Sequence, residues 1–434
     1  MEIPASPVRL RYGVNETDSW WHFALGPARD RIQERLREMG TEIVRVFLYD
    51  KSAPDPVTEW PLLRSYLDAV LAVGAVPMVT FAKFNRPADD PRAVRWFAEQ
   101  CGDVVWHCLE EWGEERVRDW YWCVWNEPNS TWIGGGLEFE QYREVYEGVA
   151  GAMLRWLAPA LKGQRLRLGG PAVEGFQPFW MDWVWRFLTE IDPSLVGFVN
   201  WHLYADWREH GENGASADVL THHAIMLWQA QEYERRARSV ARLLRQPGIL
   251  NMCGEWNAHS HYLPRVRARF NQTPFGAAYG SLALLNLIRG AVDAEMLWTG
   301  TDHECGYGVL DADAVPTPLF YARRLFAQYI RRGDRIVAPA LATGPLDGMI
   351  VDGDDGRRSA LFVHREPDEA IYDLAELTGG RLGDGCTLIK LDSGAGNGVS
   401  VQPCDGTIRI AGYGVAVVSN AVAGCDVAVA RDWA

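Results

Sequence analysis

The sequence is poor in the features that mark several common protein classes. Its eight cysteines are scattered over 434 residues with no Cys-x-x-Cys pair, which argues against a disulfide scaffold and a structural zinc site. No stretch approaches the roughly 20 apolar residues of a membrane-spanning helix. The N-terminal residues lack the positive start and apolar core of a secretory signal, so we expect a cytoplasmic protein or one presented without its leader.

Positive charge is scarce as well. The chain carries 43 Lys and Arg against 57 Asp and Glu, which gives a net charge of −14. Nucleic acids and anionic membranes bind basic surfaces, so neither is the expected partner. A polyanionic substrate is disfavoured for the same reason, although a local basic pocket could override the total. The 20 Trp, 15 Tyr and 15 Phe suit either sugar stacking or a large core.

A regular alternation runs through residues 1–335. Short runs rich in β-branched and aromatic residues are followed by longer stretches of helical spacing, as expected of βαβ units. The predicted strands are 9–14, 42–49, 75–81, 119–125, 165–170, 196–203, 248–254 and 293–298. The predicted helices include 27–39, 58–73, 91–112, 137–159, 217–245, 273–290 and about 317–331. This pattern predicts a catalytic (β/α)8 TIM barrel over residues 1–335, in preference to a doubly wound sheet with its Gly-rich first turn.

The pattern changes after residue 335. Short alternating runs are separated by Gly- and Asp-rich turns, which is typical of antiparallel strands. The predicted strands are Gly348–Val351, Ser359–Val363, Cys386–Leu391, Thr407–Ile410 and Val415–Ser419. We therefore expect residues 336–434 to form a C-terminal antiparallel β-sandwich that serves as an accessory domain.

Two glutamates stand where the chemistry of such a barrel is expected. Active sites of TIM barrels lie at the C-terminal ends of the strands. Glu127 follows the fourth predicted strand and Glu255 the seventh, each directly after an apolar run. Two carboxylates facing each other across a barrel mouth are what glycoside hydrolysis requires, because one protonates the leaving oxygen while the other attacks or activates water.

Further motifs make the pattern specific. Within clan A of the glycoside hydrolases, the chain resembles glycoside hydrolase family 39, the family of β-xylosidases and α-L-iduronidases. The motifs that carry the resemblance are Trp125-Asn-Glu-Pro-Asn129, Gly169-Gly-Pro-Ala172, His202-Leu-Tyr204, Gly254-Glu-Trp-Asn257, Trp298 and Gly306-Tyr-Gly-Val-Leu310. Their order and spacing match, and so does the β-rich tail.

The resemblance implies a role for each matching residue. It makes Glu127 the general acid/base and Glu255 the nucleophile of a retaining mechanism that needs no metal or organic cofactor. The substrate-binding residues it implies are Asn126 at the sugar's 2-hydroxyl, His202 in the sugar pocket, Tyr204 beside Glu255, Trp298 as a stacking floor and Glu304 at a hydroxyl. Arg45 resembles the arginine that keeps the nucleophile charged.

The chain also departs from its xylosidase-like relatives on the sugar-binding side. They carry a His-Gly pair just after the strand-two arginine, where this chain reads Arg45-Val-Phe-Leu-Tyr-Asp50. We expect a neutral glycoside or oligosaccharide as substrate, with Asp50 available to its hydroxyls. A silent carbohydrate-binding barrel, a uronic-acid-specific glycosidase and a metal-dependent hydrolase are the alternatives. Homo-oligomerisation stays open.

Overall fold

The fold was analysed in a computed structural model of the 434-residue chain. The structure describes residues 7–17, 20–48, 60–82, 88–131, 135–175, 179–205, 219–259, 270–302, 306–338, 344–383, 385–391 and 399–421.

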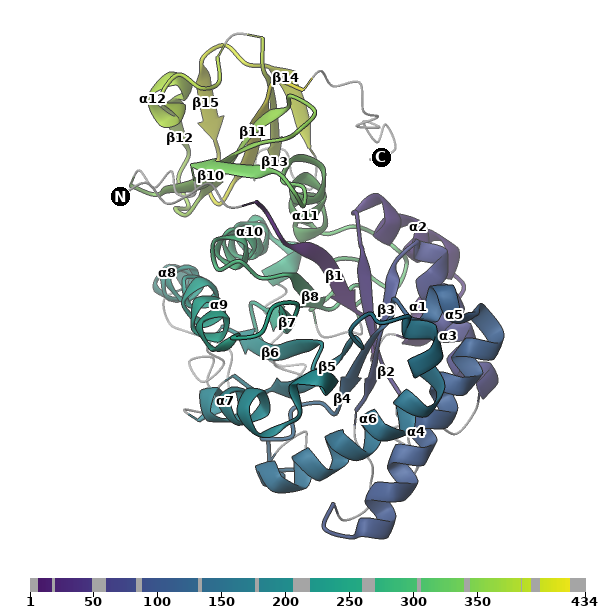
Figure 1. Cartoon of the computed structure of the whole chain (residues 1–434). Helices are drawn as coiled ribbons and strands as arrows, with labels where there is room; N and C mark the ends of the chain where they lie inside the picture. Colours follow the sequence, from purple (N-terminus) through teal and green to yellow (C-terminus); the bar gives the residue numbers. More distant parts are fainter. Residues whose placement is uncertain are drawn as a thin grey trace.

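Eight parallel strands close into a barrel in sequence order (Figure 1). They are β1 (Arg11–Asn15), β2 (Ile43–Phe47), β3 (Val76–Phe81), β4 (Tyr121–Val124), β5 (Leu168–Val173), β6 (Phe198–Tyr204), β7 (Leu250–Asn257) and β8 (Ala294–Trp298). β8 pairs with β1, which closes the ring. The predicted TIM barrel is confirmed, and each predicted strand overlaps an observed one.

The barrel strands are buried on both faces, which explains their nearly continuous apolar sequences. In β2, for example, all five residues of IVRVF are buried. Alternate residues point inward and outward, so Val44 and Val46 join the core beneath the helices while Ile43 joins a separate cluster inside the barrel. Arg45 is the polar exception in β2, and its side chain points toward the barrel interior.

Helices surround the barrel, and one of them corrects the sequence analysis. The stretch 217–245 was predicted as one helix, but it forms α8 and α9 with a break after Gln229. The α-helices are α1 (Trp20–Ala24), α2 (Arg29–Glu38), α3 (Trp60–Val73), α4 (Pro91–Trp112), α5 (Glu114–Val117), α6 (Phe139–Leu161), α7 (Trp180–Glu190), α8 (Val219–Gln229), α9 (Glu232–Leu243), α10 (Pro274–Arg289), α11 (Pro318–Tyr329) and α12 (Leu374–Thr378). Two short 3₁₀ turns span Pro193–Leu195 and Phe270–Gln272.

The C-terminal strands form antiparallel sheets beside α10 and α11 (Figure 1). A six-stranded sheet has the order β14-β13-β16-β11-β10-β9, and β12 pairs with β15. The strands are β9 (Arg335–Ala338), β10 (Leu346–Asp352), β11 (Arg358–His364), β12 (Ala370–Asp373), β13 (Thr387–Leu391), β14 (Ser400–Pro403), β15 (Thr407–Ile410) and β16 (Val415–Ser419). The predicted fold class is confirmed, whereas the division of the chain at 335/336 stays a prediction.

One face of the six-stranded sheet belongs to the same hydrophobic core as the barrel helices. Met349, Val351, Leu361 and Val363 pack into that core, while the opposite face forms a smaller cluster with α12. Polar contacts add to the junction, since Arg289 of α10 pairs with Asp347 at 2.7 Å. Among the described residues, no helix is long and apolar enough to cross a membrane.

Candidate active site

The segment that carries Glu127 leaves β4 in a strained conformation. Trp125 and Glu127 both have positive φ angles, 72° and 49°, which side chains with a Cβ rarely adopt. Backbone hydrogen bonds to the neighbouring strands hold the segment, because Trp125 donates to Phe81 and Glu127 donates to Ala172. Strain of this kind is typical of functional sites, where the surrounding structure fixes a side chain in one position.

Glu255 is positioned by an irregularity in β7. The register of β7 against β6 and β8 shifts around Gly254, as in a β-bulge. A Cβ at Gly254 would lie 2.0 Å from Oδ1 of Asn200, so only glycine allows this close approach. Bulges change the direction of neighbouring side chains, and here the Glu255 carboxylate lies near the strand-six side chains His202 and Tyr204.

Both oxygens of the Glu255 carboxylate accept strong hydrogen bonds. Nη1 of Arg45 donates to Oε1 at 2.6 Å, and the hydroxyl of Tyr204 donates to Oε2 at 2.8 Å. Arg45 is fully buried and Glu255 is nearly so. The two hydrogen bonds therefore fix the orientation of the Glu255 carboxylate through both of its oxygens.

The remaining donors of Arg45 are also engaged. Its Nε donates to Oγ1 of Thr80 at 3.0 Å, and its Nη2 donates to Oδ1 of Asn126 at 2.9 Å. Nη1 is shared with Oδ1 of Asn15 at 3.2 Å. Four strands thus meet at one guanidinium, which fixes both Glu255 and the side-chain amide of Asn126.

Glu127 has the opposite electrostatic environment. Burial raises its pKa to about 8; the Glu174 carboxylate adds to the rise and Arg45 opposes it. Oε1 of Glu127 lies 2.8 Å from Nδ1 of His202. Burial lowers the pKa of His202 to about 3, so its imidazole is neutral at neutral pH. The protonated carboxyl of Glu127 can then donate its hydrogen bond to Nδ1.

The two carboxyl groups lie close together with His202 between them. Glu127, His202 and Glu255 each offer a ligand atom within 4.8 Å of the others. Three such donors could in principle bind a metal ion. The charge of Arg45, 2.6 Å from Glu255, opposes a second cation there, and the high pKa of Glu127 favours a proton on that carboxyl. The chemistry that fits is proton transfer at Glu127 beside the hydrogen-bonded carboxyl group of Glu255.

An aromatic cluster lies at the same end of the barrel. Trp298, at the end of β8, packs with Phe47, Tyr204 and Tyr307. The ring centroids of Trp298 and Phe47 are 5.9 Å apart. Aromatic faces of this kind suit the C–H faces of a sugar ring.

The structure brings together Glu127, Glu255, Asn126, His202, Tyr204, Trp298 and Arg45, and their roles remain predictions. Asp50 and Glu304 lie outside the described residues. Asp302, two residues before Glu304, accepts hydrogen bonds from the backbone N–H groups of Gly306 and Tyr307.

Sequence reasoning missed Glu174. It directly follows β5, and its backbone is held by Asn129, which both accepts from its N–H and donates to its carbonyl. Its influence on Glu127 was not predicted. The available signal was its position: Glu174 stands two residues beyond the Gly169–Ala172 motif, at a strand end where functional side chains are expected.

Comparison with known proteins places the chain in a family. The model of the family described as "Glycosyl hydrolases family 39" matches residues 60–331, more than half of the chain. The chain belongs to glycosyl hydrolase family 39. This confirms the resemblance drawn from the sequence motifs.

Two curated proteins are similar to the chain in sequence. A β-xylosidase from Caldicellulosiruptor saccharolyticus is 22% identical over 308 residues, covering 63% of this chain and 57% of the relative. A β-xylosidase from Geobacillus stearothermophilus is 26% identical over 237 residues, covering 51% of this chain and 44% of the relative. The chain thus matches about half the length of these relatives.

Solved structures share the whole fold. A monomeric β-xylosidase from Caulobacter crescentus CB15 has a TM-score of 0.65 at 17% identity, covering 96% of this chain and 97% of that one. A family 51 α-L-arabinofuranosidase from Bifidobacterium longum also has a TM-score of 0.65, at 16% identity and 96% and 98% coverage. Barrel and C-terminal sheets therefore recur together in glycosidases of different families.

Proposed function

We propose that the chain is a retaining glycosidase, with Glu255 as nucleophile and Glu127 as general acid/base. The proposal rests on the geometry of the two carboxyl groups. A carboxyl oxygen of Glu127 and one of Glu255 lie within 4.8 Å of each other; burial raises the pKa of Glu127, whereas Glu255 accepts a hydrogen bond from the Arg45 cation. Retaining enzymes place their carboxyl groups about 5–5.5 Å apart, whereas inverting enzymes need about 6.5–9.5 Å to admit a water molecule.

The first step forms a covalent intermediate. The Glu255 carboxylate attacks the anomeric carbon, the glycosidic C–O bond breaks, and Glu127 gives its proton to the leaving oxygen. Hydrogen bonds from Arg45 and Tyr204 orient the Glu255 carboxylate for the attack. Asn126, whose side-chain oxygen accepts from Arg45, presents its NH₂ group to the sugar's 2-hydroxyl, where a hydrogen bond strengthens in the transition state.

The second step releases the sugar. Glu127, now a carboxylate, takes a proton from water as the water oxygen attacks the anomeric carbon, and the ester bond to Glu255 breaks. Two inversions give net retention. Both carboxyl groups end in their starting protonation states, so the cycle needs no other cofactor.

The substrate we propose is a neutral glycoside, with a β-xyloside as the first candidate. A uronic acid needs an arginine fork or several donors to offset the desolvation of its carboxylate. Arg45 cannot supply that fork, because its donors are engaged by Glu255, Asn126, Thr80 and Asn15. The two curated relatives are named β-xylosidases, which supports the choice of sugar.

The test combines stereochemistry with specificity. NMR of the first-formed product from an aryl β-xyloside should show the β-anomer, and a first-formed α-anomer would end the retaining assignment. kcat/KM should then be compared on matched aryl glycosides of xylose, arabinose, galactose, glucose, mannose and iduronic acid. An iduronide that is the best substrate by about tenfold, roughly 1.4 kcal/mol in the barrier, would refute the neutral sugar.

A further inference from the structure

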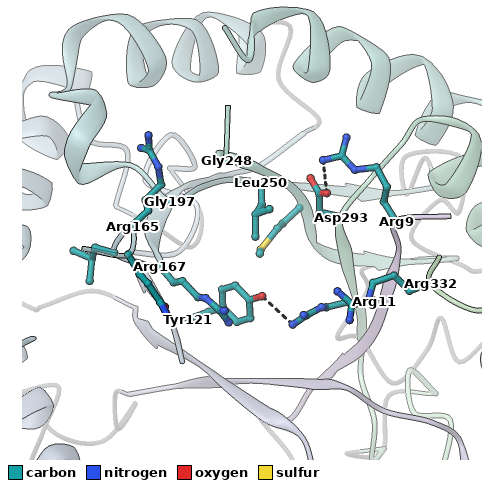
Figure 2. A pocket seen from close by; sticks show the side chains of 13 residues that line it. Arg9, Arg11, Tyr121, Arg165, Arg167, Gly197, Gly248, Leu250, Asp293 and Arg332 are labelled. Atoms are coloured by element: carbon teal, nitrogen blue, oxygen red, sulfur yellow. Dashed lines mark hydrogen bonds and ion pairs between the residues drawn. The ribbon is translucent and has the colours of Figure 1, made fainter. Parts of the chain in front are cut away.

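A cavity lies at the end of the barrel opposite Glu127 and Glu255. Its volume is about 330 Å³, and five arginines line it: Arg9, Arg11, Arg165, Arg167 and Arg332. We call this group the arginine basin. Figure 2 shows Arg165 and Arg167 on one side, Arg11 and Arg332 on the other, and Tyr121 between them. The volume falls in the range of small-ligand sites, about 300–1,000 Å³.

The topology explains why these residues meet. Arg11 begins β1, Tyr121 begins β4, and Arg167 directly precedes β5. In a barrel of parallel strands, all strand beginnings lie at one end and all strand ends, with the active site, lie at the other. The arginine basin is therefore separate from the candidate active site.

Carboxylates balance only part of the charge in the arginine basin. Arg9 pairs with Asp293 at 2.6 Å, and Arg167 pairs with Asp119 at 3.0 Å. Glu42 is near enough for Arg11 and Arg332 to lower its pKa, although burial raises that pKa more strongly. Five arginines thus face three carboxylates, an excess of positive charge in a chain whose net charge is −14.

Three of the arginines have donors that no carboxylate takes. Within the described ranges, Arg11 donates to the neutral hydroxyl of Tyr121 at 3.1 Å. Arg165 donates to the backbone carbonyls of Pro193 and Val196 at 2.6 and 2.8 Å. No residue that the structure describes forms an ion pair with Arg11, Arg165 or Arg332. Gathering cations in this way costs electrostatic energy that a bound anion would offset.

The guanidinium groups are also held in place. The carbonyls of Pro193 and Val196 anchor Arg165, and Arg167 lies over the buried ring of Tyr121, 5.1 Å from its centroid. Arg167 also donates to the carbonyl of Asp119 at 2.7 Å. Fixed planar forks bind phosphate oxygens in pairs and lose little side-chain entropy on binding.

We propose that the arginine basin binds a small phosphorylated anion with two negatively charged groups. One group contacts the Arg165 side of the cavity and the other contacts Arg11 and Arg332. A diphosphate or a bisphosphorylated sugar carries two such groups in one molecule, whereas inorganic phosphate carries one. The site is independent of the glycosidase reaction, because no catalytic residue proposed above lines it.

Calorimetric titration of the full chain with pyrophosphate, glucose 1,6-bisphosphate and inorganic phosphate, at constant ionic strength, tests this proposal. We expect saturable binding of one pyrophosphate, or of one glucose 1,6-bisphosphate, and weaker binding of inorganic phosphate, which has a single charged group. The tighter of the two larger ligands, pyrophosphate or glucose 1,6-bisphosphate, identifies how the two groups are linked. Absence of saturable binding by both up to about 10 mM, about −2.7 kcal/mol in affinity, would overturn the proposal.

Substitutions locate the bound anion. Arg332→Gln and Arg11→Gln should each weaken binding about tenfold, the loss expected for a charge-assisted hydrogen bond. Arg332 is exposed, so its substitution should leave folding intact, which the thermal unfolding midpoint checks. The matched control is Arg31→Gln, an exposed arginine in the first turn of α2 with the same change of charge. Equal weakening in the control, or unchanged binding in both basin variants, would refute the site.

Discussion

Replacing Glu127 with glutamine should stabilise the folded protein at alkaline pH. Burial raises the pKa of Glu127 from 4.5 to about 8 in the folded state, while the unfolded chain ionises near the lower value. Below pH 4.5 both states hold the proton and no penalty exists. Between pH 4.5 and 8 only the unfolded state loses it, so the free energy of unfolding falls as the pH rises. Above pH 8 the full penalty is present.

The size of the effect follows from the difference between the pKa values of Glu127 in the folded and unfolded states. Each pH unit over which the folded state alone keeps its proton costs about 1.4 kcal/mol, so the interval from 4.5 to about 8 corresponds to about 5 kcal/mol. Relaxation and water entry around the carboxylate reduce that figure in real proteins. We expect Glu127→Gln to gain at least about 2 kcal/mol over the parent protein between pH 5 and pH 9.

Urea unfolding at pH 5 and pH 9, followed by tryptophan fluorescence, measures this gain. The quantity of interest is the difference between variant and parent protein at each pH, because other groups titrate in both. Glu99→Gln serves as the control: Glu99 is exposed on α4, and its substitution should give the same difference at both pH values. Parallel pH dependences for the parent and Glu127→Gln would refute the raised pKa.

Three further predictions concern catalysis. On an aryl glycoside with a poor leaving group, kcat/KM should fall to half at about pH 8 and about tenfold per pH unit above it, because Glu127 loses its proton. Glu174→Gln should move this fall to lower pH, because it removes a negative charge that raises the pKa of Glu127. An unmoved pH profile would exclude an effect of Glu174 on the pKa of Glu127. Glu127→Ala should keep turnover of activated aryl glycosides and respond to azide, whereas Glu255→Ala should lose turnover on all substrates; equal losses on an activated substrate would contradict the assigned roles. Tyr204→Phe removes one hydrogen bond to the Glu255 carboxylate, so steady-state kinetics should show kcat about ten- to a hundredfold below the parent value with little change in KM. Dialysis of the parent protein into EDTA should leave its activity unchanged.

The barrel could be predicted from the sequence because its strands are buried on both faces. Such strands are short, continuous apolar runs, and β2 and β6 are clear examples. The strands that sequence reasoning missed are different: β9, β12 and β14 have no buried residue and so lack a strong hydrophobic pattern. The break between α8 and α9 was missed because neither glycine nor proline marks it.

The candidate site could be predicted only in part. Glu127 and Glu255 were found because each comes after an apolar run that predicts a strand. The contacts of Arg45 join residues from four strands, and no spacing along the chain predicts which of them share one guanidinium. Glu174 acts through the field at Glu127 rather than through a motif, so its effect depends on three-dimensional distance.

The shared core at the junction of barrel and C-terminal sheet has a consequence for protein engineering. Every residue of α10 from 275 to 288 is buried, which a helix on the outside of a free-standing barrel would not be. Expression of residues 1–335 alone would expose apolar surface of α10 and α11 that now packs against β11 and β16. The C-terminal sheet is therefore not an exchangeable module, and chimeras with related enzymes should join the chains within barrel loops.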